Sequence, residues 1–515
     1  MKNLRKTLEG KYKFLTGKYA GWAIYIFLAT YSIINISSIR YGSPDDLSIA
    51  SFQFNQDNSV KSALLAAEET GRIQQIPFYL INRFALLEQP TLLTQSIKLV
   101  SAGLLFFLYT WLIKSLYSTK IALVASLILL GTLSVSGEFN AINSFPLWFS
   151  LGVITFLGSC LFVVSYLRSK KLVYLVAAVF LFTIALLSSE VYFLLALTFP
   201  AIHLKMSLNQ GKPFRFSELK VFYSLIIIIS TIYFAIYQWF KYASGGNYEG
   251  TSLTFSNPFK SIAATIALSL GQVNIYGLKR QIQGDLFPIN LFFLLLFIVF
   301  FWVLFWEIKN LRAKQLGVKS LEIITIGCLA LLGNLLLGFT IKYSQIGLVY
   351  PLYLQSLISY LFVCLGFSLV LIKMNSKIFI PTVLLISIFS YSSYADQSNE
   401  YGEMRFNQNV FKVVDCFTKN PEILSYLREN IVSNDIAVLS KAYGYNYFGE
   451  KIRGATGSNY FFFRDKTVDL DQLDFSEVEV NLDNESAAGQ ITNFTYNNPV
   501  EFMKYKVSFQ GCKFE

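Results

Sequence analysis

Two adjacent carboxylates, Asp45 and Asp46, follow a Gly-Ser-Pro turn shortly after the first long apolar run of the chain. Neighbouring carboxylates suit a general base, and they also suit a hard cation such as Mg²⁺ or Mn²⁺. A simpler interpretation is a solvated turn, because Pro-Asp-Asp is a good start for a helix. The pair alone leaves both interpretations open.

Two further acids stand where apolar runs end. Glu190 lies in LLSSEVYFLLAL, at a turn of only a few residues between two apolar runs, and Glu138 lies in SGEFNAINS after another run. A carboxylate near a bilayer surface is costly unless it is paired. Both are candidates for a second functional carboxylate or for an interfacial anchor, and the anchor is favoured for Glu138.

Several common catalytic motifs are absent from the sequence. The one histidine, His203, stands at the end of an apolar run that we expect to face the cytoplasm, so a structural role is favoured. No Ser-His-Asp or Cys-His arrangement is available on the other side, and the sequence has no Walker loop, CxxC or HExxH motif. Chemistry there must use carboxylates, Lys or Arg, and a divalent cation if one binds.

The elements that position these residues are membrane helices. Of the 515 residues, 54% are hydrophobic and 15% charged, which a soluble fold of this size could not cover with polar surface. Apolar runs of the length that a bilayer requires predict an all-α polytopic protein with about eleven spans. The first run follows a basic segment without a small-residue cleavage site, so it is expected to remain as a span. The predicted spans are 19–38, 97–113, 121–136, 145–167, 172–188, 191–204, 221–240, 287–307, 321–340, 352–372 and 378–395.

Charge orients these spans. Every second connection is rich in Lys and Arg, which the positive-inside rule places in the cytoplasm together with the N-terminus. Residues 396–515 hold 12 basic and 18 acidic residues, a net charge of −6, whereas residues 1–395 carry +17. The basic character therefore reflects membrane topology and not nucleic-acid binding. We expect a transmembrane module, 1–395, and a soluble exoplasmic domain, 396–515.

The cysteines agree with this division. Cys160, Cys328 and Cys364 fall in spans, where a small buried apolar side chain is the expected role. Cys416 and Cys512 fall in the exoplasmic tail, where they can form a disulfide, and such a disulfide favours a bacterial periplasm.

Two exoplasmic segments are too long to be simple connectors. Segment 39–96 carries the Asp pair and two amphipathic stretches, 59–72 and 76–89, predicted as helices on the membrane surface. Segment 241–286 contains a short apolar stretch, 261–277, predicted as a re-entrant or interfacial helix.

The tail has strand and helix patterns. DIAVLS, EVEVNL and KYKVSF read as strands and NPEILSYLREN as a capped helix, so a small α+β domain is expected.

Basic residues on the exoplasmic side are a minority that needs an explanation. One explanation is capture of a lipid phosphate, which Arg can hold with two parallel hydrogen bonds. The other explanation is that the long side chains reach from the bilayer to the membrane interface. The residues concerned are Lys241, Lys260, Lys279, Arg280 and Lys342.

These features resemble the GT-C superfamily of integral-membrane glycosyltransferases. The Asp pair after the first span, Gly71-Arg72 further along the same loop, and Glu190 before an apolar span with Pro200 are similar to bacterial glucosyltransferases that decorate O-antigen. Lys342 stands in the stretch IKYSQIGLVYPLYLQ, where many members carry an Arg near a Pro.

The resemblance implies an inverting transfer of a hexose such as glucose from a polyprenyl-phosphate donor to an exoplasmic glycan or glycolipid. It implies that one of Asp45 and Asp46 is the base, with the other positioning the acceptor or a cation. Lys279, Arg280 or Lys342 would hold the donor phosphate, and Arg72 would brace the loop or touch phosphate. It places the protein in a bacterial inner membrane, in a process that also uses a flippase and a polyprenyl-phosphate glycosyltransferase.

Three rival functions stay open. A transporter or flippase would need ionisable groups near the bilayer midplane, and the charges here lie near span ends. A polysaccharide polymerase or ligase would fit the size, but the late outer loop, 341–351, is short. A non-catalytic scaffold would tolerate neutral residues at Asp45 and Asp46.

Overall fold

The structure is a computed structural model. It describes residues 19–38, 59–85, 92–133, 147–245, 252–271, 291–313, 319–349, 356–375, 377–395, 436–438, 477–482 and 503–508.

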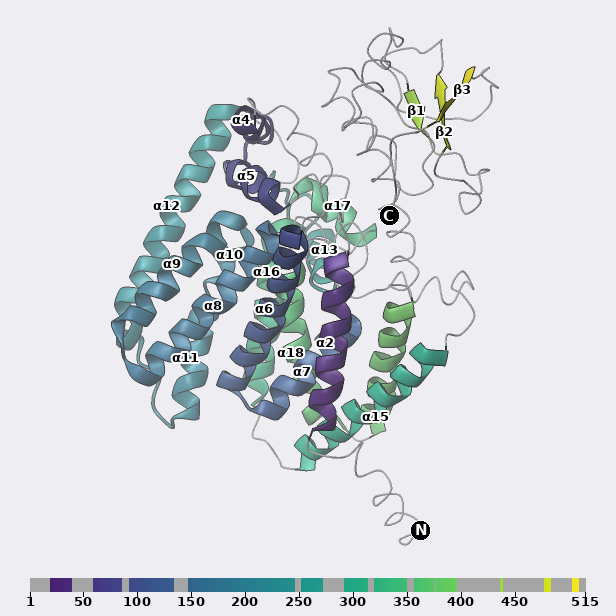
Figure 1. Ribbon diagram of the computed structural model, residues 1–515. Helices are drawn as coiled ribbons and strands as arrows, with labels where there is room; N and C mark the ends of the chain where they lie inside the picture. Colours follow the sequence, from purple (N-terminus) through teal and green to yellow (C-terminus); the bar gives the residue numbers. More distant parts are fainter. Residues whose placement is uncertain are drawn as a thin grey trace.

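Helices dominate the described part of the chain (Figure 1). They are α2 (Ala20–Ser38), α4 (Ser59–Thr70), α5 (Gln75–Ala85), α6 (Leu92–Leu116), α7 (Thr119–Thr132), α8 (Trp148–Ser169), α9 (Leu172–Ser188), α10 (Val191–Leu195), α11 (Thr198–Asn209), the short 3₁₀ helix η3 (Phe216–Leu219), α12 (Lys220–Ser244), α13 (Pro258–Ser269), α15 (Leu291–Ala313), α16 (Ser320–Gly338), α17 (Ile341–Val349) and α18 (Ser356–Lys373), followed by the helix Lys377–Ala395.

The expectation of a polytopic helical membrane protein is confirmed. Among the described residues, nine helical segments are long and apolar enough to cross a membrane. Two of the predicted spans are shorter apolar helices, α7 and α9. The span Val191–Asn209 joins α10 and α11 through a short break. Each of the predicted spans therefore corresponds to an apolar helical segment in the structure.

The core lies around α7, whose residues from Ile121 to Thr132 are all buried. It packs against α2, α6, α15 and α18. Buried hydroxyls tie these helices together, since backbone and polar groups in a bilayer must find partners within the protein. Tyr109 donates to the Leu361 carbonyl at 2.9 Å, and Tyr394 donates to the Leu130 carbonyl at 3.0 Å.

Small residues allow close helix crossings. A Cβ added to Gly333 would overlap Ser359 Oγ, so α16 and α18 approach through a glycine. At Gly338, a Cβ would overlap the Thr265 hydroxyl and press on the α13 backbone. Such small contacts are the usual route to tight packing between membrane helices.

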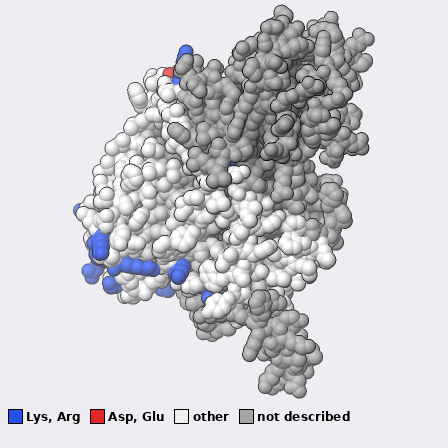
Figure 2. Space-filling model, in the orientation of Figure 1, with Lys and Arg blue, Asp and Glu red and all other residues white. Residues whose placement is uncertain are grey.

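Lys and Arg side chains gather at one end of the bundle (Figure 2). We call this the basic end; it comprises 114–120, 168–171, 205–220, 309–313, 319–322 and 373–375. Polar contacts join five of these stretches, all but 309–313: Arg168 to the Ser115 carbonyl at 2.6 Å, Lys170 to Glu218 at 2.8 Å, Lys205 to Glu322 at 3.0 Å and Lys373 to Ser320 at 3.4 Å. The charge segregation expected from sequence is thus a property of the fold, and the positive-inside rule predicts that this end faces the cytoplasm.

The opposite end carries short helices between the spans. The first part of the predicted stretch 261–277 lies in the helix α13, and residues 272–277 lie outside the described residues. The helix begins earlier than predicted, at Pro258, because Asn257 caps it and accepts from the Lys260 amide at 3.0 Å. The stretch 341–351, expected to be a short loop, contains the helix α17. Backbone hydrogen bonds between Thr254 and Phe339 (2.7 Å) and between Ile341 and Ser252 (2.9 Å) hold the two helices together.

The expectations for the first loop and for the span cysteines have different outcomes. The described parts of the amphipathic stretches 59–72 and 76–89 contain the helices α4 and α5, and α4 exposes apolar Val60, Leu64 and Leu65 as an interfacial helix would. The prediction that all three span cysteines are buried is wrong for Cys328, which is exposed on α16, whereas Cys160 and Cys364 are buried. A helix that packs against others on just one side has residues on its other side that face outward. A residue that lies in a span is therefore not always buried.

Three strands fall on the tail segments predicted to be strands. They are β1 (Ile436–Val438), β2 (Glu477–Leu482) and β3 (Met503–Ser508), antiparallel in the order β1-β2-β3. Ile436 pairs with Leu482, and Val480 pairs with Tyr505. The helix expected in NPEILSYLREN lies outside the described residues, so the α+β domain stays a prediction.

Candidate functional site

Of the residues to which the resemblance gives a place in the site, three lie in the described part of the chain: Arg72, Glu190 and Lys342. Two further basic residues considered for a lipid phosphate are also described, Lys241 in the last turn of α12 and Lys260 near the start of α13. The other candidates, Asp45, Asp46, Glu138, Lys279 and Arg280, lie outside it, as do both cysteines of the expected disulfide, Cys416 and Cys512.

Glu190 sits on the turn between α9 and α10. Ser189 is extended (φ −164°, ψ 143°) and Glu190 returns to helical angles, so the chain turns within two residues. The indole of Trp148 donates to the Ser188 carbonyl at 2.8 Å. Gly152 leaves the space that the Ser188 hydroxyl fills, since a Cβ there would overlap it. The helix α8 thus holds the turn that carries the carboxylate.

Arg72 is positioned by the end of α4. Gly71 adopts a left-handed conformation (φ 65°), its amide donates to the Glu68 carbonyl at 3.2 Å, and the Arg72 amide donates to the Ala67 carbonyl at 3.0 Å. This pair of bonds is the Schellman motif, in which glycine is strongly preferred because it has no Cβ. The Gly-Arg dipeptide therefore has a structural meaning: glycine ends the helix and turns arginine toward the bundle.

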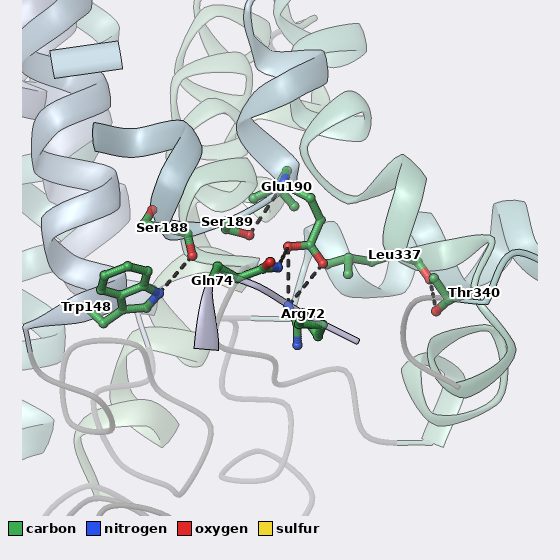
Figure 3. Close-up of polar contacts among 9 residues, drawn as sticks. Arg72, Gln74, Trp148, Ser188, Ser189, Glu190, Leu337 and Thr340 are labelled. Carbon is green, nitrogen blue, oxygen red and sulfur yellow. Dashed lines mark hydrogen bonds and ion pairs between the residues drawn. The ribbon is translucent and has the colours of Figure 1, made fainter. Parts of the chain in front are cut away.

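The two residues form an ion pair across 118 positions of sequence. Arg72 Nη2 lies 3.1 Å from Glu190 Oε1 and 3.3 Å from Oε2. Gln74 Nε2 donates to Oε2 at 2.8 Å (Figure 3). The side chains of Arg72 and Glu190 are only 12% and 17% exposed. The carboxylate thus accepts three hydrogen bonds, most of its capacity.

A tyrosine of α12 borders this cluster. Tyr233 is 8% exposed and lies close enough to Glu190 and Arg72 for their charges to act on its hydroxyl. Its ring stacks on Tyr237 with centroids 6.2 Å apart. Among the described residues, neither the Tyr233 hydroxyl nor Gln74 Oε1 has a hydrogen-bond partner. The cluster therefore offers one donor and one acceptor that a polar group such as a sugar hydroxyl could use.

Lys342 belongs to the same end of the molecule. It stands in the first turn of α17, with its ammonium 5.7 Å from the Tyr343 ring centroid. The preceding corner is fixed by the Thr340 hydroxyl, which donates to the Leu337 carbonyl at 2.8 Å. Figure 3 shows this corner in the same view as Glu190, and α10 packs against α16.

Sequence reasoning missed two polar residues. Gln74 gave little signal, because a glutamine in a polar stretch between two amphipathic helices is unremarkable. Lys98 did give one: it is a lysine within an apolar span, and it is only 1% exposed. Intramembrane ionisable residues are rare and point to function. The antiparallel packing of α2 and α6, fixed by Tyr25 and Thr110 at 3.0 Å, places Lys98 at about the height of buried Asn35.

His203 has the structural environment expected for it. It is buried, its Nδ1 lies 3.0 Å from the Tyr223 hydroxyl, and its ring packs 4.7 Å from the Phe214 ring. No group of three or more His, Cys, Asp or Glu side chains within the described ranges could hold a metal ion. The predicted metal ligands, Asp45 and Asp46, lie outside those ranges.

No protein-family model matches the chain, and no curated protein matches it.

Proposed function

We propose that the protein is an inverting GT-C-type glycosyltransferase that moves a hexose from a polyprenyl-phosphate carrier to an exoplasmic glycan or glycolipid. The observation that carries the proposal is the ion pair between Arg72 and Glu190, supported by Gln74. The residues through which the sequence resembles the superfamily are far apart along the chain, yet two of them meet in a buried contact. A helix cap and a tight turn position that contact.

In the proposed reaction, one carboxylate of Asp45 and Asp46 takes the proton of the acceptor hydroxyl. The acceptor oxygen attacks the anomeric carbon of the donor sugar, and the bond to the lipid phosphate breaks. Lys342, together with Lys279 and Arg280, holds the phosphate that leaves with the electron pair. Where Mg²⁺ or Mn²⁺ takes part, the same two carboxylates would be its ligands, and the ion would stabilise charge on the phosphate.

Arg72 acts as a brace in this proposal. Its guanidinium is already engaged by a carboxylate, so it holds the segment that follows the Asp pair against the α9–α10 turn. Glu190 is then a positioning residue and not a second base. Both assignments follow from the contact itself and leave the base to the Asp pair.

A sugar-lipid transporter is the second candidate. Lys98 lies three residues inside the end of the span Gln95–Leu116 and not at its middle, but its side chain is 1% exposed, and this burial is the observation that favours the candidate. Transporters use buried ionisable side chains along the substrate path. The transferase needs the Asp pair, whereas a carrier that depends on Lys98 does not.

The test is mass analysis of surface glycans in cells that carry Asp45→Asn or Asp46→Asn at matched protein levels. We expect one substitution to remove a hexose-sized mass. Glu69→Gln is the control, because Glu69 is an exposed carboxylate on α4 of the same outer segment. If both Asp variants leave every glycan mass unchanged while Lys98→Met removes one, the transporter replaces the transferase.

A further inference from the structure

An apolar slot opens near the basic end, remote from the Arg72–Glu190 contact. It lies between α11 and α16 and is backed by α6, α8 and α18. Near the break between α10 and α11 the packing changes: α10 lies against α16, whereas α11 touches α16 at few points. The two helices diverge toward the basic end, and the slot is the space between them.

The walls of the slot are almost entirely apolar. Leu112 and Ile113 of α6, Ile202 of α11, Ile326 of α16 and Leu361 of α18 are among the side chains that line it. The Tyr109 hydroxyl at its inner part is already satisfied by a backbone carbonyl. A polar ligand would leave its own groups unpaired there, so the walls suit a hydrocarbon chain.

The rim carries charge. Lys205 of α11 reaches across to Glu322 of α16 at 3.0 Å, and its ammonium lies 4.3 Å from the Tyr117 ring centroid. Because these opposite charges neutralise each other, exposed Lys319 supplies the net positive charge of the rim. The surrounding end of the bundle is also basic (Figure 2). A ligand with an apolar chain and an anionic head complements both parts of the slot.

The length of the slot selects the ligand further. On α16 it runs from Lys319 to Leu329, about 15 Å at the helical rise per residue. That is about half of a bilayer core, the depth of one leaflet. Apolar Leu208 and Leu321, 38% and 56% exposed, flank the opening, so the slot is accessible from the side where lipid chains would lie.

We propose that this slot binds one anionic phospholipid from the leaflet at the basic end. One acyl chain fills the space between α11 and α16, and the phosphate lies against Lys319. The bound lipid supplies the packing that α11 lacks against α16. The inference does not depend on the proposed transferase activity, because the donor phosphate is assigned to the opposite end.

The experiment is native mass spectrometry of the full chain, with phosphatidylglycerol or phosphatidylcholine of the same acyl chains added. We expect one phosphatidylglycerol to be retained and phosphatidylcholine to be retained several-fold less. Equal retention of both lipids overturns the anionic assignment. Preferential retention of a polyprenyl phosphate over phosphatidylglycerol overturns the phospholipid assignment.

Two matched pairs of variants locate the site. Thr325→Trp fills the slot, whereas Ile324→Trp adds the same bulk at the neighbouring position, which is 61% exposed and outside the slot. We expect only Thr325→Trp to lose the lipid. Lys319→Gln should weaken retention several-fold, and Lys171→Gln, at the exposed start of α9, should not.

The variants are compared at equal helix content by circular dichroism. If Thr325→Trp does not fold, Ala201→Phe narrows the slot from α11 and replaces it. Retention at the wild-type level in the folded slot-filling variant overturns the proposal.

Discussion

Two ion pairs, one at each end of the helical bundle, are nearly alike in geometry and differ in surroundings. Arg72–Glu190 joins residues 118 positions apart at 3.1 Å, and Lys205–Glu322 joins residues 117 positions apart at 3.0 Å. Both pairs are largely buried. The first has an amide partner and a packed turn around it, whereas the second crosses an apolar slot.

The comparison shows that the role of a buried ion pair depends on the structural elements that the pair holds together. At the Arg72 end, every neighbouring contact fixes the position of a carboxylate: the Gly71 helix end, the Trp148 bond and the Gln74 amide. At the Lys205 end, the pair bridges two helices that otherwise diverge. Four substitutions test this contrast.

The largest effect is expected for Arg72→Met. This change leaves Glu190 buried without its counter-charge, and breaking such a pair costs about 3 kcal/mol. We expect a clear fall in the thermal unfolding midpoint in detergent and loss of the glycan product. The double variant Arg72→Met/Glu190→Gln is the control; it should recover stability but not activity. Equal stability of the single and double variants would contradict the assignment.

Lys205→Met should cost less, about 2 kcal/mol, the scale of a buried group that loses one hydrogen-bond partner, although its ion pair is as short. Glu322 stands at the first turn of α16 beside Lys319, so other cations of the basic end can compensate it. The unfolding midpoint should fall, while the glycan product persists. Loss of product at full protein level would show that the two ends are coupled.

Gln74→Leu removes one hydrogen bond to Glu190 and keeps the ion pair. The expected cost is about 1 kcal/mol, because Arg72 still satisfies both oxygens. Gln74→Glu places a second carboxylate beside the first and should be worse. The comparison of the two unfolding midpoints separates hydrogen bonding from charge; if Gln74→Glu is the milder change, the contact is misassigned.

Lys170→Met should have the smallest effect, well under about 1 kcal/mol. Its pair with Glu218 is shorter, at 2.8 Å, but the two side chains are 52% and 34% exposed. An unfolding midpoint within error of the wild type is expected. A fall as large as that of Lys205→Met would show that burial does not decide the strength of these pairs.

Much of the architecture could be predicted from the sequence. Long apolar runs mark helices because a bilayer forces the backbone to satisfy its own hydrogen bonds, and the run length follows from membrane thickness. The sequence singles out the Gly71-Arg72 dipeptide and places Glu190 at a tight turn, and the structure has Gly71 at the end of α4 and Glu190 between α9 and α10. Cys328 was expected to be buried and is exposed, since a run that is apolar all round does not show which face packs inward.

The sequence by itself determined the spans, the segregation of Lys and Arg to one end, and the strand segments of the tail, because each depends on local composition or period. Only the tertiary structure decided that Arg72 binds Glu190, that Lys98 is buried, and that α11 and α16 leave a slot. These features depend on how helices far apart in the chain pack against one another. A helix can rotate about its axis or tilt without any change in its composition. The local sequence pattern therefore does not predict which residues of two distant helices will meet.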